Sequence, residues 1–400
     1  MILFAGCACE SIAKISPRDL RLLDEYVLAL RLSPQLNRIA WGAHEGYVLL
    51  VRADGSADIV NVGYMDNGKL VWNRNGLFFG GPTTEYALEQ EGIKAHERGV
   101  HEEYEAERFS DLNEKGSIAV YNAGIAEDGD IFTIVSSNGD QLNYWDISGF
   151  FRSFAHCEDK ILGITSSGEV NSEVKRLLSA PLSSDVLMQL YPKPESTQSS
   201  IAAQIDRSAG YEYHHFMGSA PCINGVIYIL AFKTSTSNSQ NTTPVLRVWD
   251  SISSAYKDIP LISEDGEPLA IDSEDIDLAA EAGSMNSDNS LYYWVSWRDG
   301  KVRAVNLSSG ITRELFTVDI SYARGQSQFF LTDNKVFVLD VKDDRQEMVF
   351  ASYSIPSGAK KEYFTIRGLD HVERLRMPRN IIRDMAINPQ WLTRIKSRIK

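Results

Sequence analysis

Aromatic and imidazole side chains gather in the segment Tyr-Glu-Tyr-His-His, residues 211–215. Imidazoles donate and accept hydrogen bonds near neutral pH, and tyrosines add hydroxyls and flat rings, so this segment carries ligand-binding chemistry. If the segment is a strand, alternation points one of the two adjacent histidines inward and the other outward. The candidate ligand-binding residues here are Tyr211, Tyr213, His214 and His215, and the alternative is that the histidines are internally bonded or lie on the surface.

Metal-ligating residue types occur elsewhere, but their spacing does not suit a metal site. His96 and His101 are five residues apart, whereas two ligands on one helical face stand four apart. They belong to a charged run, residues 96–107, that is typical of a solvated helix or loop. The acidic run at 272–277 lacks the glycine and the terminal glutamate of a calcium-binding EF-hand loop. We expect no metal site and no cofactor.

The sequence also lacks the common local motifs of nucleotide-binding and hydrolytic enzymes. It holds no Gly-x-Ser-x-Gly elbow, no phosphate-binding Walker loop and no dinucleotide fingerprint. We expect no catalytic residue on these grounds. Carboxylates assembled from distant segments would leave no such motif, so a catalytic site of that kind stays open.

The charge distribution argues against one large class of function. The chain has 400 residues, 43% of them hydrophobic, and a net charge of −14, whereas a dedicated nucleic-acid binder normally carries a basic face. No run of 18 apolar residues is present, so no spanning helix is predicted. Residues 361–400 nonetheless hold ten Lys and Arg against four Asp and Glu. Such a basic tail indicates an internal contact, an anionic partner surface or a solvated helix.

One unit of strands and turns recurs along the chain. An apolar stretch rich in β-branched and aromatic residues begins near residues 47, 131, 161, 226, 291 and 336. A small or apolar stretch often precedes it, and two short strands joined by a Gly or Ser turn often follow it. Once the polar inserts are set aside, the spacing approaches the roughly 40–50 residues of a four-stranded propeller blade.

These repeats resemble those of β-propellers over residues 36–367. Trp-Asp dipeptides at 145–146 and 249–250 are similar to those that end a blade strand in WD-repeat propellers. The resemblance implies an all-β fold of about seven four-stranded blades closed into a ring, with six or eight blades as alternatives. The expected blades are 36–73, 74–116, 117–154, 155–205, 206–262, 280–318 and 322–367, between an N-terminal segment 1–35 and a C-terminal tail 368–400.

The two ends lie outside the expected repeat. Residues 16–30 fit a capped helix and a strand equally well. Near the C-terminus, Trp391, Leu392, Ile395 and Ile399 share one face of a short helix, and basic residues lie off that face. This basic helical tail is expected either to pack on the propeller or to lie on a membrane surface.

The segment Leu3-Phe4-Ala5-Gly6-Cys7 resembles a bacterial lipobox, in which small residues precede a cysteine that is lipidated after cleavage. Phe4 departs from that motif, which prefers Leu, Val or Ile, and only six residues precede Cys7. The resemblance implies lipidation at Cys7 and an extracytoplasmic protein anchored to the membrane or cell envelope. The alternatives are a buried thiol in an apolar N-terminal strand and a cytoplasmic location.

Cys157 and Cys222 hold equivalent places in the repeat, just before the second strand of neighbouring expected blades. Equivalent positions on adjacent inner strands can approach one another, and a bridge requires Cα atoms within about 7 Å. In an oxidising compartment this pair is a candidate disulfide. The alternative is two small buried thiols.

Loops on a rigid scaffold are the usual place for binding, so partner recognition is expected at the mouth of the channel. The candidate loops contain Asn73 and Arg74, Tyr211–His215, and Tyr322 and Arg324. The sequence thus predicts a non-catalytic envelope propeller that binds a protein or glycan, but no nucleic acid. Membrane contact is expected through the lipid anchor or the basic tail. The alternatives are a propeller hydrolase or lyase acting on sugars or lactones, and an intracellular scaffold.

Overall fold

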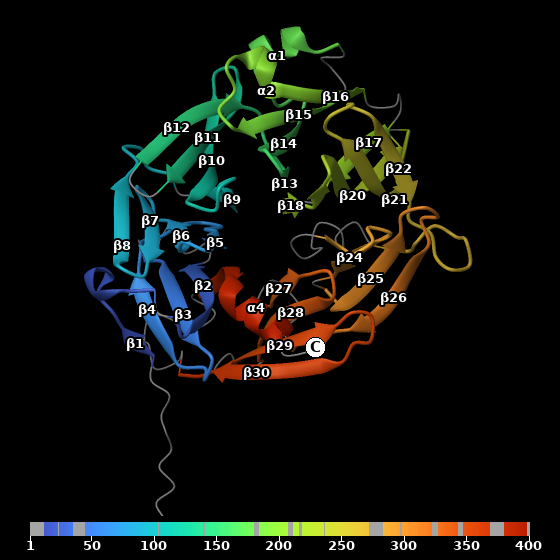
Figure 1. Cartoon of the computed structure of the whole chain (residues 1–400). Coiled ribbons are helices and arrows are strands. Elements are labelled where there is room, and N and C mark those ends of the chain that lie inside the picture. The colour runs from blue at the N-terminus through green and yellow to red at the C-terminus, as the bar shows by residue number, and fades with distance from the viewer. Residues whose placement is uncertain are drawn as a thin grey trace, which may run out of the picture.

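The computed structural model describes residues 12–22, 24–34, 45–102, 104–138, 141–179, 184–206, 211–215, 218–235, 237–271, 283–296, 298–321, 327–342, 347–368 and 380–397. These residues form seven β-sheets arranged as blades around a common centre (Figure 1). Each blade contains four strands in antiparallel order, from an inner strand near the centre to an outer strand at the rim. The predicted all-β propeller of seven four-stranded blades is confirmed.

Blades one to three occupy the blue to blue-green part of the ring (Figure 1). Blade one contains β31 (Asn380–Ile387), β2 (Tyr26–Pro34), β3 (Tyr47–Arg52) and β4 (Ala57–Asn61), with β1 (Ala13–Lys14) parallel at its outer edge. Blade two contains β5 (Leu70–Trp72), β6 (Leu77–Gly80), β7 (Thr84–Glu89) and β8 (Gly92–Glu97). Blade three contains β9 (Glu105–Ser110), β10 (Ser117–Ala126), β11 (Gly129–Asn138) and β12 (Gln141–Ser148).

Blades four to seven complete the ring. Blade four contains β13 (Ser153–Cys157), β14 (Lys160–Ser166), β15 (Ser184–Tyr191) and β16 (Ile201–Asp206), and inserts carry α1 (Ser172–Leu177) and α2 (Thr197–Ser200). Blade five contains β20 (Val226–Ser235), β21 (Asn238–Asp250) and β22 (Tyr256–Pro260), and its inner position is shared by β17 (Tyr211–His215) and β19 (Cys222–Ile223), which pair with different parts of β20. Blade six contains β23 (Ser284–Met285), β24 (Leu291–Val295), β25 (Lys301–Asn306) and β26 (Thr312–Thr317). Blade seven contains β27 (Gln328–Leu331), β28 (Lys335–Val341), β29 (Met348–Ser354) and β30 (Lys360–Ile366).

The two ends of the chain meet inside blade one. Strand β2 pairs with β3 on one side and with β31 on the other, and Leu28 lies opposite Ile387. All nine residues of β2 are buried, because neighbouring blades cover both of its faces. The ring therefore extends beyond the expected limits 36–367, and residues 26–34 form a strand rather than a helix. This closure leaves no open edge at the junction of the two ends.

The later blades were located more accurately than the earlier ones. The apolar stretches near residues 161, 226, 291 and 336 are the second strands of blades four to seven, as expected. The stretches near residues 47 and 131 are the third strands of blades one and three, not the second. Blade one takes its inner strand, β31, from the C-terminal part of the chain and its other strands from the N-terminal part. As a result, blade two begins at Leu70 and blade three at Glu105, ahead of the expected boundaries at 74 and 117.

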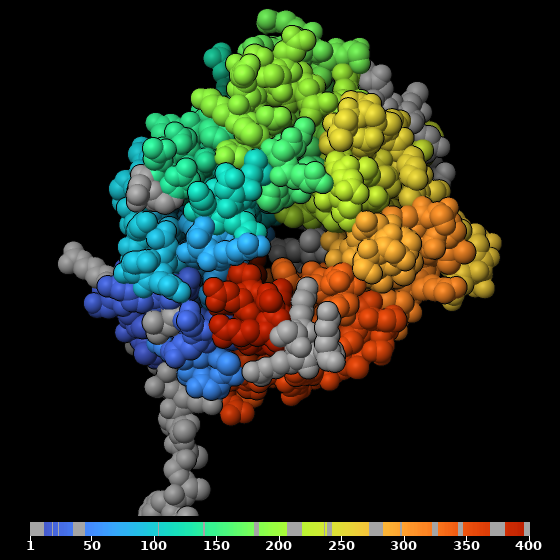
Figure 2. Space-filling model, viewed as in Figure 1, coloured from blue at the N-terminus to red at the C-terminus, as the bar shows by residue number. Residues whose placement is uncertain are grey.

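Helix α4 (Pro389–Ser397) follows β31 and packs on blade seven. The Trp391 ring lies 5.1 Å from the Tyr363 ring and 6.0 Å from the Phe350 ring, centroid to centroid, and Ile395 is buried in the same cluster. In Figure 2 this red segment lies on the face turned to the viewer, beside the middle of the ring. Packing on the propeller is thus the outcome for Trp391, Leu392 and Ile395, and Ile399 lies outside the described residues. Within the described ranges, no helix has the length and apolar character needed to cross a bilayer.

Asn388 fixes the junction between β31 and α4. Its side-chain Oδ1 accepts from the backbone N–H groups of Gln390 and Trp391 (2.8 and 3.3 Å), and its Nδ2 donates to the carbonyl of Tyr26 (2.8 Å). We expect Asn388→Ala to lower the free energy of unfolding by about 1–2 kcal/mol, because it removes a helix N-cap. Urea unfolding of the purified chain measures this. Asn388→Ser keeps a capping oxygen, so it should lose less; an equal loss would show that the cap is not the source.

Candidate binding site

A polar pocket of about 330 Å³ opens on the face of the ring that carries α4. It lies where the β5–β6 and β7–β8 turns of blade two meet the β9–β10 turn of blade three and the ends of blade one. Its lining comes from residues 72–75 and 89–91, with Leu22, Asp24, Lys115, Asn388 and Gln390. Two of the predicted site residues, Asn73 and Arg74, belong to this lining.

Asn73 holds the pocket in shape rather than facing a ligand. Its side chain is buried, and its Oδ1 accepts from the backbone N–H groups of Asn75 and Gly76 at 2.9 and 3.3 Å. Its Nδ2 donates to the hydroxyl of Ser110 and the carbonyl of Gly116 in blade three, both at 3.0 Å. All of its polar atoms are thus occupied, and it ties the turn of blade two to that of blade three.

Arg74 lies at the rim of the pocket with its side chain 81% exposed. Its Nε is 2.8 Å from a carboxylate oxygen of Glu114 in blade three. An exposed pair of this kind contributes at most about 1 kcal/mol to stability. The guanidinium is therefore available to a ligand at little cost to the fold.

Elsewhere between blades two and three lies a buried charge cluster. Arg108 of β9 donates through Nε to Glu105 (2.6 Å) and through Nη2 to the Tyr121 hydroxyl (2.8 Å), and its Nη1 lies 2.9 Å from Glu85 of β7. Arg98, after β8, donates to the other Glu85 oxygen at 2.7 Å. We call these five residues the Arg108 cluster. Each is at most 4% exposed.

The pKa values in this cluster follow from burial and charge. Burial alone would raise the pKa of Glu85, but the Arg108 and Arg98 charges outweigh it and lower that pKa. Burial and the nearby Glu85 charge raise the pKa of Glu105 despite its bond to Arg108. The run 96–107 was expected to be solvated, and this is wrong for Arg98 and Glu105, because their partners on β7 and β9 pull them into the interior.

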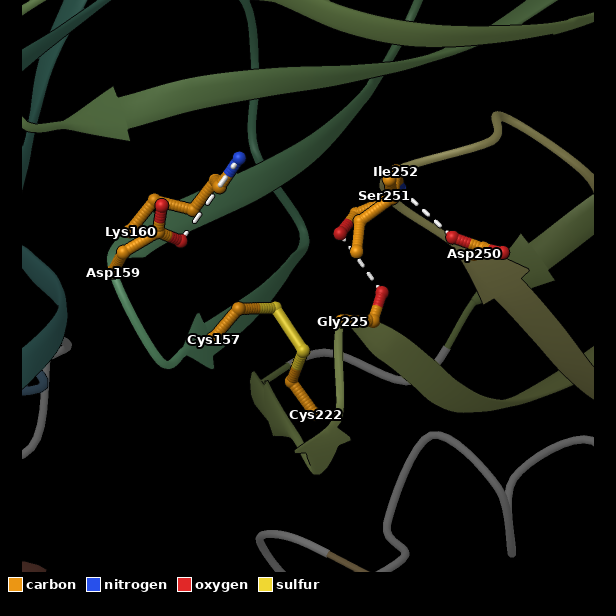
Figure 3. The surroundings of a disulfide bond; sticks show 8 residues. All are labelled: Cys157, Asp159, Lys160, Cys222, Gly225, Asp250, Ser251 and Ile252. Carbon is orange, nitrogen blue, oxygen red and sulfur yellow. Dashed lines mark hydrogen bonds and ion pairs between the residues drawn. A yellow bond between two sulfur atoms is a disulfide. The ribbon is translucent and has the colours of Figure 1, made fainter.

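A disulfide joins blades four and five, between Cys157 at the end of β13 and Cys222 of β19 (Figure 3). The two Cα atoms are 5.1 Å apart. Strand β18 (Gly218–Ala220), which precedes Cys222, adds in parallel to β13 of the neighbouring blade. The inner strands of blades four and five are thus linked both covalently and by backbone hydrogen bonds.

The model of the YycP β-propeller domain family matches residues 21–387. This chain belongs to that family. The matched range contains β2 and β31, so it spans the closed ring of this YycP-family propeller. A search of curated proteins finds no match.

Solved structures share the fold of this YycP-family propeller at low sequence identity. A hypothetical selenium-binding protein from Sulfolobus tokodaii is 10% identical with a TM-score of 0.50, and the match covers 91% of this chain and 93% of that one. A putative 6-phosphogluconolactonase from Bacteroides fragilis is 10% identical with a TM-score of 0.45, covering 92% and 99%. At 10% identity the likeness to the first structure shows the fold alone, and the likeness to the second carries no conclusion.

The structure describes the other predicted site residues of this YycP-family propeller only in part. Residues 211–215 form β17, whose backbone pairs with β20, and their side chains lie outside the described parts of the chain. Cys7, Tyr322, Arg324 and the acidic run at 272–277 also lie outside the described residues. Sequence reasoning missed Trp72, Gln90 and Gln390 of the pocket. The turn sequence Asn-Arg-Asn-Gly after Trp72 was the one local signal for them.

The buried acids elsewhere in the described residues also have partners within the protein. The described residues include nine buried Asp and Glu side chains, and each one accepts a hydrogen bond or forms an ion pair within the protein. Arg247, for example, joins Asp185 of blade four to Asp258 of blade five at 2.7 and 3.0 Å. In the described part of the chain, no group of three His, Cys, Asp or Glu side chains is placed to hold a metal ion.

A second hollow of about 270 Å³ lies at the rim, between β12 of blade three and the helical inserts of blade four. Trp145 and Met188 form part of its apolar wall, and Lys193 and Asp146 supply charge. The Trp145 ring stacks on Tyr191 at 6.2 Å. This hollow contains none of the predicted site residues.

Proposed function

We propose that this chain is a non-catalytic binding propeller of the bacterial cell envelope, which recognises a protein or glycan through the polar pocket and the mouth around it. The state of the buried acids carries this proposal. All nine that are described accept a hydrogen bond or form an ion pair within the protein, and Glu85 and Asp185 join neighbouring blades in this way. A hydrolytic site needs carboxyl groups that substrate can reach.

The enzyme alternative predicts two acids that face each other in the channel. Glu85 and Glu105 do approach a common point, but Arg108 lies between them and both are at most 1% exposed. Substrate has no access to either carboxylate in this arrangement. The geometry therefore favours binding over hydrolysis or lyase chemistry.

The envelope location is supported by the Cys157–Cys222 disulfide, because disulfides persist in oxidising compartments and are rare in the cytosol. The same bond weighs against the intracellular scaffold. The lipobox-like segment ending at Cys7 would supply the anchor. The apolar face of α4 is packed on blade seven, so membrane contact in this proposal rests on the lipid rather than on the tail.

Expression from the native gene with its own upstream DNA tests the location. We expect a mature chain that begins at Cys7, carries added acyl mass and sits in the membrane fraction; intact-mass spectrometry and fractionation measure both. Cys7→Ala should abolish the acyl mass and release the chain from the membrane. An unmodified cytosolic chain would overturn the envelope location and make the intracellular scaffold the leading interpretation.

A further inference from the structure

We infer that the polar pocket between blades one, two and three receives a saccharide without net charge, such as a neutral or N-acetylated sugar. This rests on the proposed binding function and names the ligand class of its site. The inference stands on four features of the pocket: its few apolar side chains, its exposed amides, its mutually neutralised charges and its rigid frame.

The pocket has few apolar side chains. Leu22 and Trp72 are the apolar members of the lining, and each is half-buried. A peptide anchored by apolar side chains gains roughly 25 cal/mol per Å² of apolar surface that it buries, and this lining has little to offer it. Trp72 adds an indole to the lining, and the face of an indole suits the C–H face of one sugar ring. A polyhydroxylated ligand fits this combination better than a peptide does.

Three exposed amides surround the pocket, each from a different part of the ring: Asn75 after β5, Gln90 between β7 and β8, and Gln390 in the first turn of α4. An amide side chain offers a donor and an acceptor side by side. Adjacent hydroxyls on a sugar also donate and accept, so one amide can bind two of them. Asn75 is held by a bond from its Nδ2 to the Glu114 carbonyl at 2.6 Å, and Gln90 donates from its Nε2 to Asp24 at 3.4 Å.

The charges of the pocket are of both signs and largely neutralise one another. Arg74 pairs with Glu114 at 2.8 Å, and Glu89 pairs with Lys94 at 3.1 Å. The remaining charged residues of the lining are one cation, Lys115, and two anions, Asp24 and Glu91. No strong field of one sign selects an anionic ligand, so an uncharged saccharide is favoured over a sulfated or uronic one.

The frame that carries these side chains is rigid. Asn73 ties the turns of blades two and three together, and Asn388 ties α4 to the backbone of β2. Both side chains are buried and fully bonded. Binding to such a preformed site costs little ordering entropy, so a small ligand can bind with few contacts.

An array of neutral, N-acetylated, uronic-acid and sulfated oligosaccharides tests the inference with the full chain. We expect binding to neutral or N-acetylated members. For the best one, calorimetry should give a dissociation constant about tenfold weaker for the Gln90→Ala/Gln390→Ala variant, since two ligand hydrogen bonds are lost. Both glutamines are exposed, so the variant should fold; circular dichroism checks this. Gln198→Ala, an exposed glutamine of α2 away from the pocket, is the matched control and should bind as the parent chain does.

The outcomes separate this inference from the proposed function. An empty array, binding to acidic sugars alone, or equal binding by the double variant would overturn the saccharide assignment. If the chain is also found lipidated at the envelope, that location still stands and a protein partner becomes the better assignment. If sugars bind and the double variant fails while the chain is cytosolic, the saccharide site stands and the envelope location falls.

Discussion

Replacing Arg108 with methionine is expected to lower the free energy of unfolding by about 3–5 kcal/mol, because it leaves buried carboxylates without their shared cation. Arg108 lies 2.6 Å from Glu105 and 2.9 Å from Glu85, and both acids are at most 1% exposed. Methionine fills much of the volume but offers neither acid a donor. Urea unfolding at neutral pH, followed by circular dichroism, measures the change.

The loss should depend on pH in a defined direction. The folded-state pKa of Glu85 lies below its usual value near 4.5, so its ion pairs stabilise the fold above that value, and this stability is lost as pH falls through the lowered pKa. In the variant, Glu85 keeps its bond to Arg98 but Glu105 loses Arg108, so burial raises the folded-state pKa of Glu105 further and the penalty for its charge is fully present at neutral pH. Protonation relieves that penalty as pH falls, so the difference between variant and parent should narrow below about pH 5.

Arg74→Met is the control for this experiment. Its guanidinium also pairs with a glutamate, at 2.8 Å, but it is 81% exposed, so the expected change is within about 1 kcal/mol. If the two variants lose the same stability, burial of the Arg108 cluster contributes nothing special. If the Arg108 variant shows a loss that does not narrow in acid, lost packing rather than uncompensated charge is responsible.

Periodic apolar strands made the blades visible in the sequence. The stretches that became β14, β20, β24 and β28 are short apolar runs, rich in β-branched and aromatic residues, that end near turn residues, so each could be recognised from its own residues. The pairing of β2 with β31 could not, because it joins segments at opposite ends of the chain. Local patterns say that a strand exists, but not which distant strand lies beside it. For that reason the expected boundaries of the first three blades lay too far toward the C-terminus.

The candidate site was visible only in part for a similar reason. Asn73 and Arg74 stand out as turn residues after a strand, but Gln90 and Gln390 look like any exposed polar residue until three blades bring them together. The Arg108 cluster could not be recognised from the sequence, because its residues look solvated there. Arg98 and Glu105 sit in a run of charges that is typical of a solvated surface, and only their distant partners bury them.

Removing the bond between Cys157 and Cys222 is expected to lower the free energy of unfolding by about 2–4 kcal/mol. The bridge closes a loop with a sequence separation of 65, so it restricts the unfolded chain strongly, and chain-entropy arguments put the upper end of the effect at about 4 kcal/mol. It also crosses between two blades, where β18 adds to β13 through only three residue pairs. The Cys157→Ala/Cys222→Ala variant should therefore lose stability, and blades four and five should exchange amide hydrogens faster than the rest of the ring.

Reductant supplies the control that separates the bond from the side chains. Reduced parent protein should unfold at nearly the same urea concentration as the double-alanine variant, and the variant should not respond to reductant at all. A variant that does respond would implicate the N-terminal cysteines instead. If reduction leaves the parent unchanged, the hydrogen bonds between β18 and β13 hold this junction without the bridge. The disulfide would then be dispensable to the stability of the fold.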